Sequence, residues 1–274
     1  MIKRTSDKNL LLEYIFIIFV CLLSIFPFYF MIVSATNKST DIIAGRMIPG
    51  LYLFHNFKNL LTTPTVSLWR TLWNSLRTSV LQTVLSIFVC SIAGYGFQFY
   101  RDKKKDAMMK ILLLSMMIPF ASTMIPLFKM FSKAHLLNTT LGFIMPSIST
   151  AFLIFFFRQN SQAFPTETIQ AARVDGLSEI AIYFKIYMPI MMPTYAAAAI
   201  VTFMSAWNNY LWPLIVMQSN SMRTMPLFVT NLTAGYVTDY GMLMLAVTIM
   251  TLPTIILFFT QQRRFVEGIT GSIK

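Results

Sequence analysis

Tyr14-Ile-Phe-Ile-Ile-Phe-Val-Cys-Leu-Leu-Ser-Ile-Phe-Pro-Phe-Tyr-Phe-Met-Ile-Val33 is a run of 20 residues without a charged side chain. A helix of about 20 apolar residues crosses the roughly 30 Å of hydrocarbon in a bilayer. The whole chain of 274 residues is 56% hydrophobic and only 12% charged, whereas soluble domains carry about 25% charged residues. So few charges cannot cover a water-exposed surface. The composition predicts a membrane protein with several spans and excludes a disordered chain or a water-soluble enzyme.

Five further apolar stretches are long enough to cross the membrane. Because they are continuous Leu, Ile, Phe and Met runs and do not alternate with polar residues, we expect helices. The fold class is therefore an all-α membrane protein with six transmembrane helices. After the first run, the stretches are Leu72–Phe99, Ile111–Phe128, Leu141–Phe157, Ile186–Met217 and Met242–Thr260.

The distribution of basic residues predicts the orientation. With the N-terminus inside, fourteen of the 22 Lys and Arg residues are cytoplasmic, seven are exterior and Arg77 is intramembrane. This bias places both termini in the cytoplasm, so the net charge of +12 is a topology signal and no nucleic-acid partner is expected. The expected parts are a cytoplasmic N-terminus (1–12), a first transmembrane helix (13–34), an exterior loop (35–70), a transmembrane core (71–262) and a cytoplasmic C-terminus (263–274).

The start of the chain also resembles a cleavable signal peptide, with small residues at Val33-Ser34-Ala35. Its apolar run is longer than the usual 7–15 residues or so, which favours a retained helix.

Residues for catalysis or cofactor binding are scarce. His55 and His135 lie far apart and have no ligand-spaced partners, and Cys21 and Cys90 lie inside apolar runs. Gly45 and Gly50 have the glycine spacing of a phosphate loop, but Leu51 occupies the position at which such a loop needs lysine. We therefore expect no catalytic residue, metal or cofactor in this chain. The carboxylates also avoid mid-membrane positions, which counts against proton- or sodium-driven transport without excluding it.

The segment Arg158–Lys185 is an unusually long cytoplasmic loop that predicts a helix–turn–helix. Pro165 marks a helix start, and Gly176 supplies the positive φ that ends the helix after roughly 11 residues. Ser178 is placed to cap a second helix, in which Ile180, Phe184 and Met188 share one face. An ordinary amphipathic pair of helices at the membrane surface is the alternative.

This loop resembles one found in the inner-membrane subunits of binding-protein-dependent ABC importers. Their pattern is E-A-A, three residues, G, nine residues, I-x-L-P. The present chain has Gln170-Ala171-Ala172, then Gly176, then Ile186-Tyr-Met-Pro189 at the same spacing, and departs from the pattern at Gln170 and Met188. The stretches Ser205–Pro213 and Arg264–Gly268 resemble the carbohydrate branch of the family, of the maltose-permease type.

The resemblance implies an ABC importer type I permease fold, with a coupling helix in residues 158–188 that docks on a cytoplasmic ATPase. Gln170, Ala171, Ala172, Asp175 and Gly176 are the implied coupling residues, with the two alanines keeping one face thin. The implied partners are a second homologous permease subunit, two ATPase subunits that hold ATP and magnesium, an extracellular solute-binding protein, a sugar and membrane lipid. The chain alone is expected to be inert.

The fifth span is the candidate for lining a translocation pathway. Amides beside aromatic faces suit a sugar, which offers hydroxyls at its rim and C–H groups on its faces. An interfacial aromatic belt with helix-joining amides is the alternative. The candidate residues are Trp207, Asn208, Asn209, Tyr210 and Trp212.

The sequence therefore predicts the permease subunit of an ATP-driven sugar importer in the plasma membrane. A secondary carrier or channel for a small polar solute remains the alternative, and a membrane enzyme finds no convincing catalytic set. Ser86, Cys90 and Gly94 form a stripe of small residues that we assign to helix packing.

Overall fold

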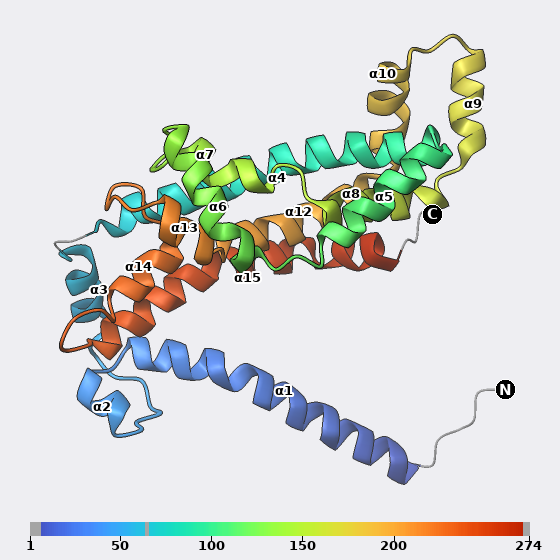
Figure 1. Cartoon of the computed structure of the whole chain (residues 1–274). Helices are drawn as coiled ribbons and strands as arrows, with labels where there is room; N and C mark the ends of the chain where they lie inside the picture. The colour runs from blue at the N-terminus through green and yellow to red at the C-terminus, as the bar shows by residue number, and fades with distance from the viewer. Residues whose placement is uncertain (1–6, 64–65, 271–274) are drawn as a thin grey trace. The chain divides into compact units, whose positions relative to one another are not determined.

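The computed structural model describes residues 7–63 and 66–270, and side chains within 10–63 and 66–262. Every regular element in these residues is helical (Figure 1). The predicted terminal segments 1–12 and 263–274 therefore lie partly outside the described residues, as do the side chains of the Arg264–Gly268 motif.

The helices follow one another with short connections. Their bounds are α1 Asp7–Ala35, α2 Ser39–Ile43, α3 Leu53–Leu61, α4 Leu68–Phe99, α5 Lys103–Ser115, α6 Phe120–Lys133, α7 Thr140–Ile144, η1 Met145–Ser147, α8 Ala151–Asn160, η2 Ser161–Ala163, α9 Thr166–Val174, α10 Glu179–Ile182, η3 Tyr183–Tyr187, α11 Met188–Ile190, α12 Met192–Trp207, α13 Leu211–Val216, α14 Met225–Asn231 and α15 Tyr240–Thr270. Of these, η1 and η2 are 3₁₀ turns and η3 is a π-helical turn.

Three helices in the described residues are long and apolar enough to cross a membrane alone, namely α1, α4 and α15. The third, fourth and fifth predicted spans are each broken into two parts, so six crossings result when every bent pair counts as one. The bends are 99° between α5 and α6, 51° between η1 and α8, and 79° between α11 and α12. Pro119 precedes α6, Pro146 lies in η1, and Pro189 and Pro193 flank the last bend, in keeping with the loss of a backbone donor at proline.

The chain divides into two compact units, and the first comprises residues 1–67 and 229–252. It contains α1, α2 and α3, so about half of the segment predicted as an exterior loop (35–70) is helical. Asn56 joins its parts, because its Nδ2 donates to the carbonyls of Ala35 (2.9 Å) and Asn37 (3.0 Å). Gly241 must be glycine for steric reasons, since a Cβ there would lie 2.5 Å from the Asn37 carbonyl oxygen.

The second unit, residues 68–228 and 253–274, is built around α4, which packs along α8 and α12. The predicted small-residue stripe forms the α4–α8 contact. The Ser86 hydroxyl donates to the carbonyl of Ser147 at 2.7 Å, and the Cys90 thiol lies 3.6 Å from that of Ile148. These carbonyls lie at the break before α8, where the helical hydrogen bonds are interrupted. The stripe therefore packs two helices and also satisfies the backbone of a broken span.

Candidate functional site

The predicted coupling helix is α9, and its ends match the signals in the sequence. Pro165 occupies the N-cap, and Gly176 has a φ of +79°. The Leu177 amide donates to the Ala172 carbonyl (3.0 Å) and the Gly176 amide to that of Arg173 (3.1 Å), which is the Schellman arrangement. The helix has nine residues, two fewer than predicted, because Pro165 lies before it as the N-cap and Asp175 lies beyond it as the C-cap. The turn that follows α9 is thus fixed by its own backbone.

The two faces of α9 differ. Ile169 and Ala172 are buried against the bundle, whereas Gln170, Ala171 and Val174 are exposed. Of the two alanines predicted to form a thin outer face, only Ala171 lies on that face. Ala172 points inward because the helical period places it beside Ile169, three residues earlier.

The second helix of the loop, α10, is tied to the first. The Ser178 hydroxyl accepts from the Ala181 amide at 3.3 Å, which confirms the predicted cap. Arg173 Nε donates to Glu179 Oε1 at 2.6 Å, and its Nη2 reaches Oε2 at 3.3 Å. This carboxylate raises the pKa of Arg173 further above its usual range through the hydrogen bond. Arg173 and Glu179 thus form a bidentate ion pair that joins α9 to α10 across the turn.

The same ion pair touches the end of α4. The Arg173 guanidinium lies 5.4 Å from the centre of the Tyr100 ring, and the Tyr95 hydroxyl lies 3.4 Å from Glu179 Oε2. Both helices of the loop project beyond the end of α4 (Figure 1). The loop is therefore bonded to the bundle as well as internally.

A chain of hydroxyl groups crosses the bend between α11 and α12. The Tyr183 hydroxyl, in η3, lies 2.7 Å from Ser91 Oγ and 2.9 Å from the Tyr195 hydroxyl, so it joins η3 to both α4 and α12. Tyr183 and Tyr187 stack with ring centres 5.6 Å apart, and both pack on Tyr95. The π-helical turn was not predicted. It is the wider turn in which these two tyrosines occur, and such turns are frequent at functional sites.

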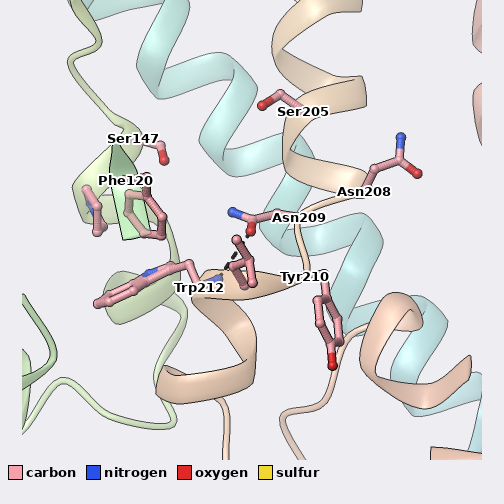
Figure 2. Close-up of a pocket in the computed structure, with 9 residues that line it drawn as sticks. Phe120, Ser147, Ser205, Asn208, Asn209, Tyr210 and Trp212 are labelled. Atoms are coloured by element: carbon pink, nitrogen blue, oxygen red, sulfur yellow. Dashed lines mark hydrogen bonds between the residues drawn. The ribbon is translucent and has the colours of Figure 1, made fainter. Parts of the chain in front are cut away.

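At the other end of α12 lies a hollow of about 410 Å³, lined by both apolar and uncharged polar side chains. None of its lining residues in the described chain is charged. In Figure 2, the side chains of Asn209 and Phe120 point toward one another above the Trp212 indole. The lining comprises Phe120, Pro146, Ser147, Ser205, Asn208, Asn209, Tyr210, Leu211 and Trp212.

The hollow forms where helices are interrupted. Phe120 follows the break between α5 and α6, Ser147 precedes the break before α8, and residues 208–210 separate α12 from α13. Irregular backbone at membrane depth is tolerated where it lines a cavity, and discontinuous helices form the sites of many transporters. The amides and hydroxyls at these interruptions can both donate and accept hydrogen bonds.

The structure separates the predicted pathway residues into two groups. Asn208, Asn209, Tyr210 and Trp212 line the hollow, although the Asn208 amide donates to the Met204 carbonyl at 2.9 Å and points away from Asn209 (Figure 2). Trp207 is buried and stacks on Phe203 (5.8 Å between ring centres), so it is not part of the lining.

Trp212 serves packing more than ligand contact. Only 1% of the residue is exposed, its Nε1 donates to the Gly142 carbonyl at 2.9 Å, and Phe131 packs edge-on against it. Both predicted indoles are therefore used by the core, and Tyr210, 36% exposed, is the predicted aromatic side chain that stays open to the hollow. Phe120, 42% exposed, is the aromatic side chain that sequence reasoning missed. Its position directly after Pro119 could have indicated it, because proline interrupts a helix and so marks a break in the span.

Several membrane-spanning helices, an uncharged hollow at the interruptions of three of them and a surface loop held by an ion pair are features of membrane transport proteins. Residues 86–271 match the family described as the binding-protein-dependent transport system inner membrane component. The chain belongs to this family and is a permease subunit of an ABC importer, embedded in the plasma membrane by several spans. Proteins of this family work with an ATPase and a binding protein.

Two relatives match the chain over nearly its full length. The lactose transport system permease protein LacG of Rhizobium radiobacter is 45% identical over 99% of this chain and 98% of its own. The arabinooligosaccharides transport system permease protein AraQ of Halalkalibacterium halodurans is 34% identical over the whole of both. A crystal structure of a bacterial ABC transporter involved in import of the acidic polysaccharide alginate matches with a TM-score of 0.81. It covers 97% of this chain and 99% of its own at 19% identity, which supports the fold.

Proposed function

We propose that this chain translocates a neutral sugar by alternating access, driven by ATP that separate subunits hydrolyse. The observation that carries the proposal is that one helix connects both sites. α12 begins after the loop at Met192, ends at Trp207, and carries Ser205 of the hollow's lining near that end; its length is about 24 Å at 1.5 Å per residue. A displacement of the loop therefore acts directly on the hollow's lining.

Sugar as the substrate is supported by the chemistry of the hollow. Ser147, Ser205 and Asn209 offer uncharged donors and acceptors beside the exposed Phe120 ring. A phosphorylated or acidic solute would need a cation to offset its charge, and no lining residue supplies one. The names of the two relatives, for lactose and for arabinooligosaccharides, are consistent with a neutral sugar.

We further propose that α9 docks on the ATPase through its exposed face, with Gln170 and Ala171 in contact and Asp175-Gly176 fixing the turn. Ala172 supports the helix from within. The working assembly comprises this chain, a second homologous permease subunit, two ATPase subunits and an extracellular binding protein. The bias of basic residues supports cytoplasmic termini and a cytoplasmic loop.

Proteoliposomes that contain the assembled importer provide the test. Sugar uptake should need ATP and binding protein and should persist when ionophores collapse proton and sodium gradients. A cysteine introduced by Ala171→Cys should crosslink to the ATPase, whereas Ala172→Cys, buried in this chain, is the matched control and should not. Uptake that ionophores abolish and ATP does not drive would favour the secondary carrier. Failure of Ala171→Cys to crosslink during uptake would reject the docking face.

A further inference from the structure

The short helix α3 has three distinct faces. Successive helical residues are about 100° apart, so Leu53, Phe54, Phe57 and Leu61 share an arc of roughly 100°. Asn56 and Leu60 form a neighbouring seam that is buried in the chain. The remaining arc carries the polar side chains His55, Lys58 and Asn59.

The apolar arc is open. Phe54 is 79% exposed, Leu53 48% and Leu61 40%, and the preceding Leu51 is fully open at 99%. A run of large apolar side chains on one helical face, next to a polar face, is typical of helices that lie in a membrane surface. Singly scattered apolar residues would not require such an explanation.

Hydrogen bonds fix the depth of α3 relative to α1. Asn56, in the middle of α3, donates to the carbonyl of Ala35, the last residue of α1. Just before α3, the Tyr52 amide donates to the Thr36 carbonyl at 2.9 Å. The uncharged run of α1 ends at this same point, and the end of a spanning run lies at the boundary between acyl chains and headgroups. The seam of α3 is therefore held at the level of the membrane surface.

We infer that α3 lies in the plane of the membrane surface and that its open apolar arc binds lipid. Leu53, Phe54 and Leu61 enter the boundary between headgroups and acyl chains, while Lys58, next to the arc, reaches lipid phosphate. His55 and Asn59 face water, where their side chains lie 3.2 Å apart. This assignment does not depend on the transported solute or on which side of the membrane α3 occupies.

Spin labels distinguish lipid, water and protein as the surroundings of this arc. The full-length chain, co-purified with its partners, is placed in nanodiscs of phosphatidylethanolamine and phosphatidylglycerol. Cys21→Ser removes the exposed cysteine, buried Cys90 is retained, and labels are attached through Phe54→Cys or, as the matched control, His55→Cys. The parent without an introduced cysteine measures background labelling, and retained uptake shows that each variant folds.

At Phe54 we expect collisions with oxygen, which concentrates in lipid, to exceed those with water-soluble nickel chelate several-fold, and we expect the reverse at His55. Nickel access at Phe54 equal to that at His55 would place the arc in water. Poor access of both reagents at Phe54 would show that a protein partner covers it. Either result would overturn the lipid assignment.

Discussion

Replacing Tyr183 by phenylalanine should cost more stability than replacing Tyr195, its hydrogen-bond partner, by phenylalanine. The Ser91 hydroxyl donates to the Phe88 carbonyl at 3.1 Å. With its one proton used there, we expect Ser91 to accept from Tyr183 and Tyr183 to accept from Tyr195, across distances of 2.7 and 2.9 Å. Tyr183→Phe removes both of these bonds and leaves the buried Tyr195 hydroxyl without its acceptor. Tyr195→Phe removes one bond and leaves every donor in the chain of hydroxyls paired.

The magnitudes follow from this order. A net hydrogen bond contributes about 1 kcal/mol, and a buried donor left unpaired costs roughly 1–3 kcal/mol. Tyr183→Phe loses one bond and leaves one donor unpaired, so it should cost about 2–4 kcal/mol, and Tyr195→Phe should cost about 1 kcal/mol. The ring contacts of Tyr183 with Tyr95 and Tyr187, at 5.5 and 5.6 Å between centres, persist in the phenylalanine variant, so no cavity adds to the cost.

Thermal unfolding of the full-length chain, followed by the fluorescence of its buried tryptophans, measures the difference. At about 2–4 °C per kcal/mol, Tyr183→Phe should lower Tm by roughly 4–16 °C and Tyr195→Phe by roughly 2–4 °C. Tyr236→Phe is the control, because Tyr236 is fully exposed, and it should leave Tm unchanged. A Tm loss for Tyr195→Phe equal to or larger than that for Tyr183→Phe would refute the donor order.

Three other changes test the coupling loop and the hollow. Glu179→Gln should lower the free energy of unfolding by at most about 1 kcal/mol, because its ion pair with Arg173 is partly exposed. It should nevertheless raise the number of ATP molecules hydrolysed per sugar imported. An unchanged ratio in proteoliposomes would show that the Arg173–Glu179 pair is not needed for coupling. Gly176→Val forces a β-branched residue to a φ of +79°, which costs about 1–2 kcal/mol, and it should abolish ATPase association in a pull-down while membrane insertion persists. Gly176→Asn is the control, because asparagine tolerates this φ, and it should retain association. Normal uptake by the valine variant would reject the coupling role. Asn209→Ala should raise the KM for sugar uptake with little change in Tm. Trp212→Phe, which loses the hydrogen bond to the Gly142 carbonyl, should lower Tm. The reverse pattern would mean that Trp212 contacts the sugar and Asn209 serves packing.

The conformation of the proposed coupling loop could be predicted because its signals are local. Pro165 at a helix start, Gly176 at positive φ and Ser178 as a cap each act within a few residues, and the structure contains all three. The six apolar runs were likewise visible, since lipid selects for length and hydropathy. The inward orientation of Ala172 follows from the packing of Ile169 on the bundle, which requires the tertiary structure.

The hollow could be predicted only in part, because its lining comes from residues that are far apart in the sequence. Asn209 and Tyr210 stand in a recognisable stretch of the fifth span, but Phe120 and Ser147 come from helices that are distant in sequence. The break at Ser147 is accommodated by a distant residue as well, because the Ser86 hydroxyl donates to the Ser147 carbonyl. The burial of Trp207 and Trp212 depends equally on distant partners, and apolar periodicity does not separate a core indole from an exposed one.

Transmission from loop to hollow requires that each joint between them be stiffer than the helices it connects. The Schellman turn closes α9, the Arg173–Glu179 pair joins α9 to α10, and the Tyr183 hydroxyl fastens η3 to both α4 and α12 across the 79° bend. If any one of these contacts breaks, a displacement at Ala171 changes the local geometry of the loop and does not move Asn209. Substitutions at the joints should therefore uncouple ATP hydrolysis from import without changing the KM for sugar, and substitutions in the hollow should do the converse. A joint variant that left the ratio of ATP hydrolysed to sugar imported unchanged would mean that this joint does not transmit motion from the loop to the hollow.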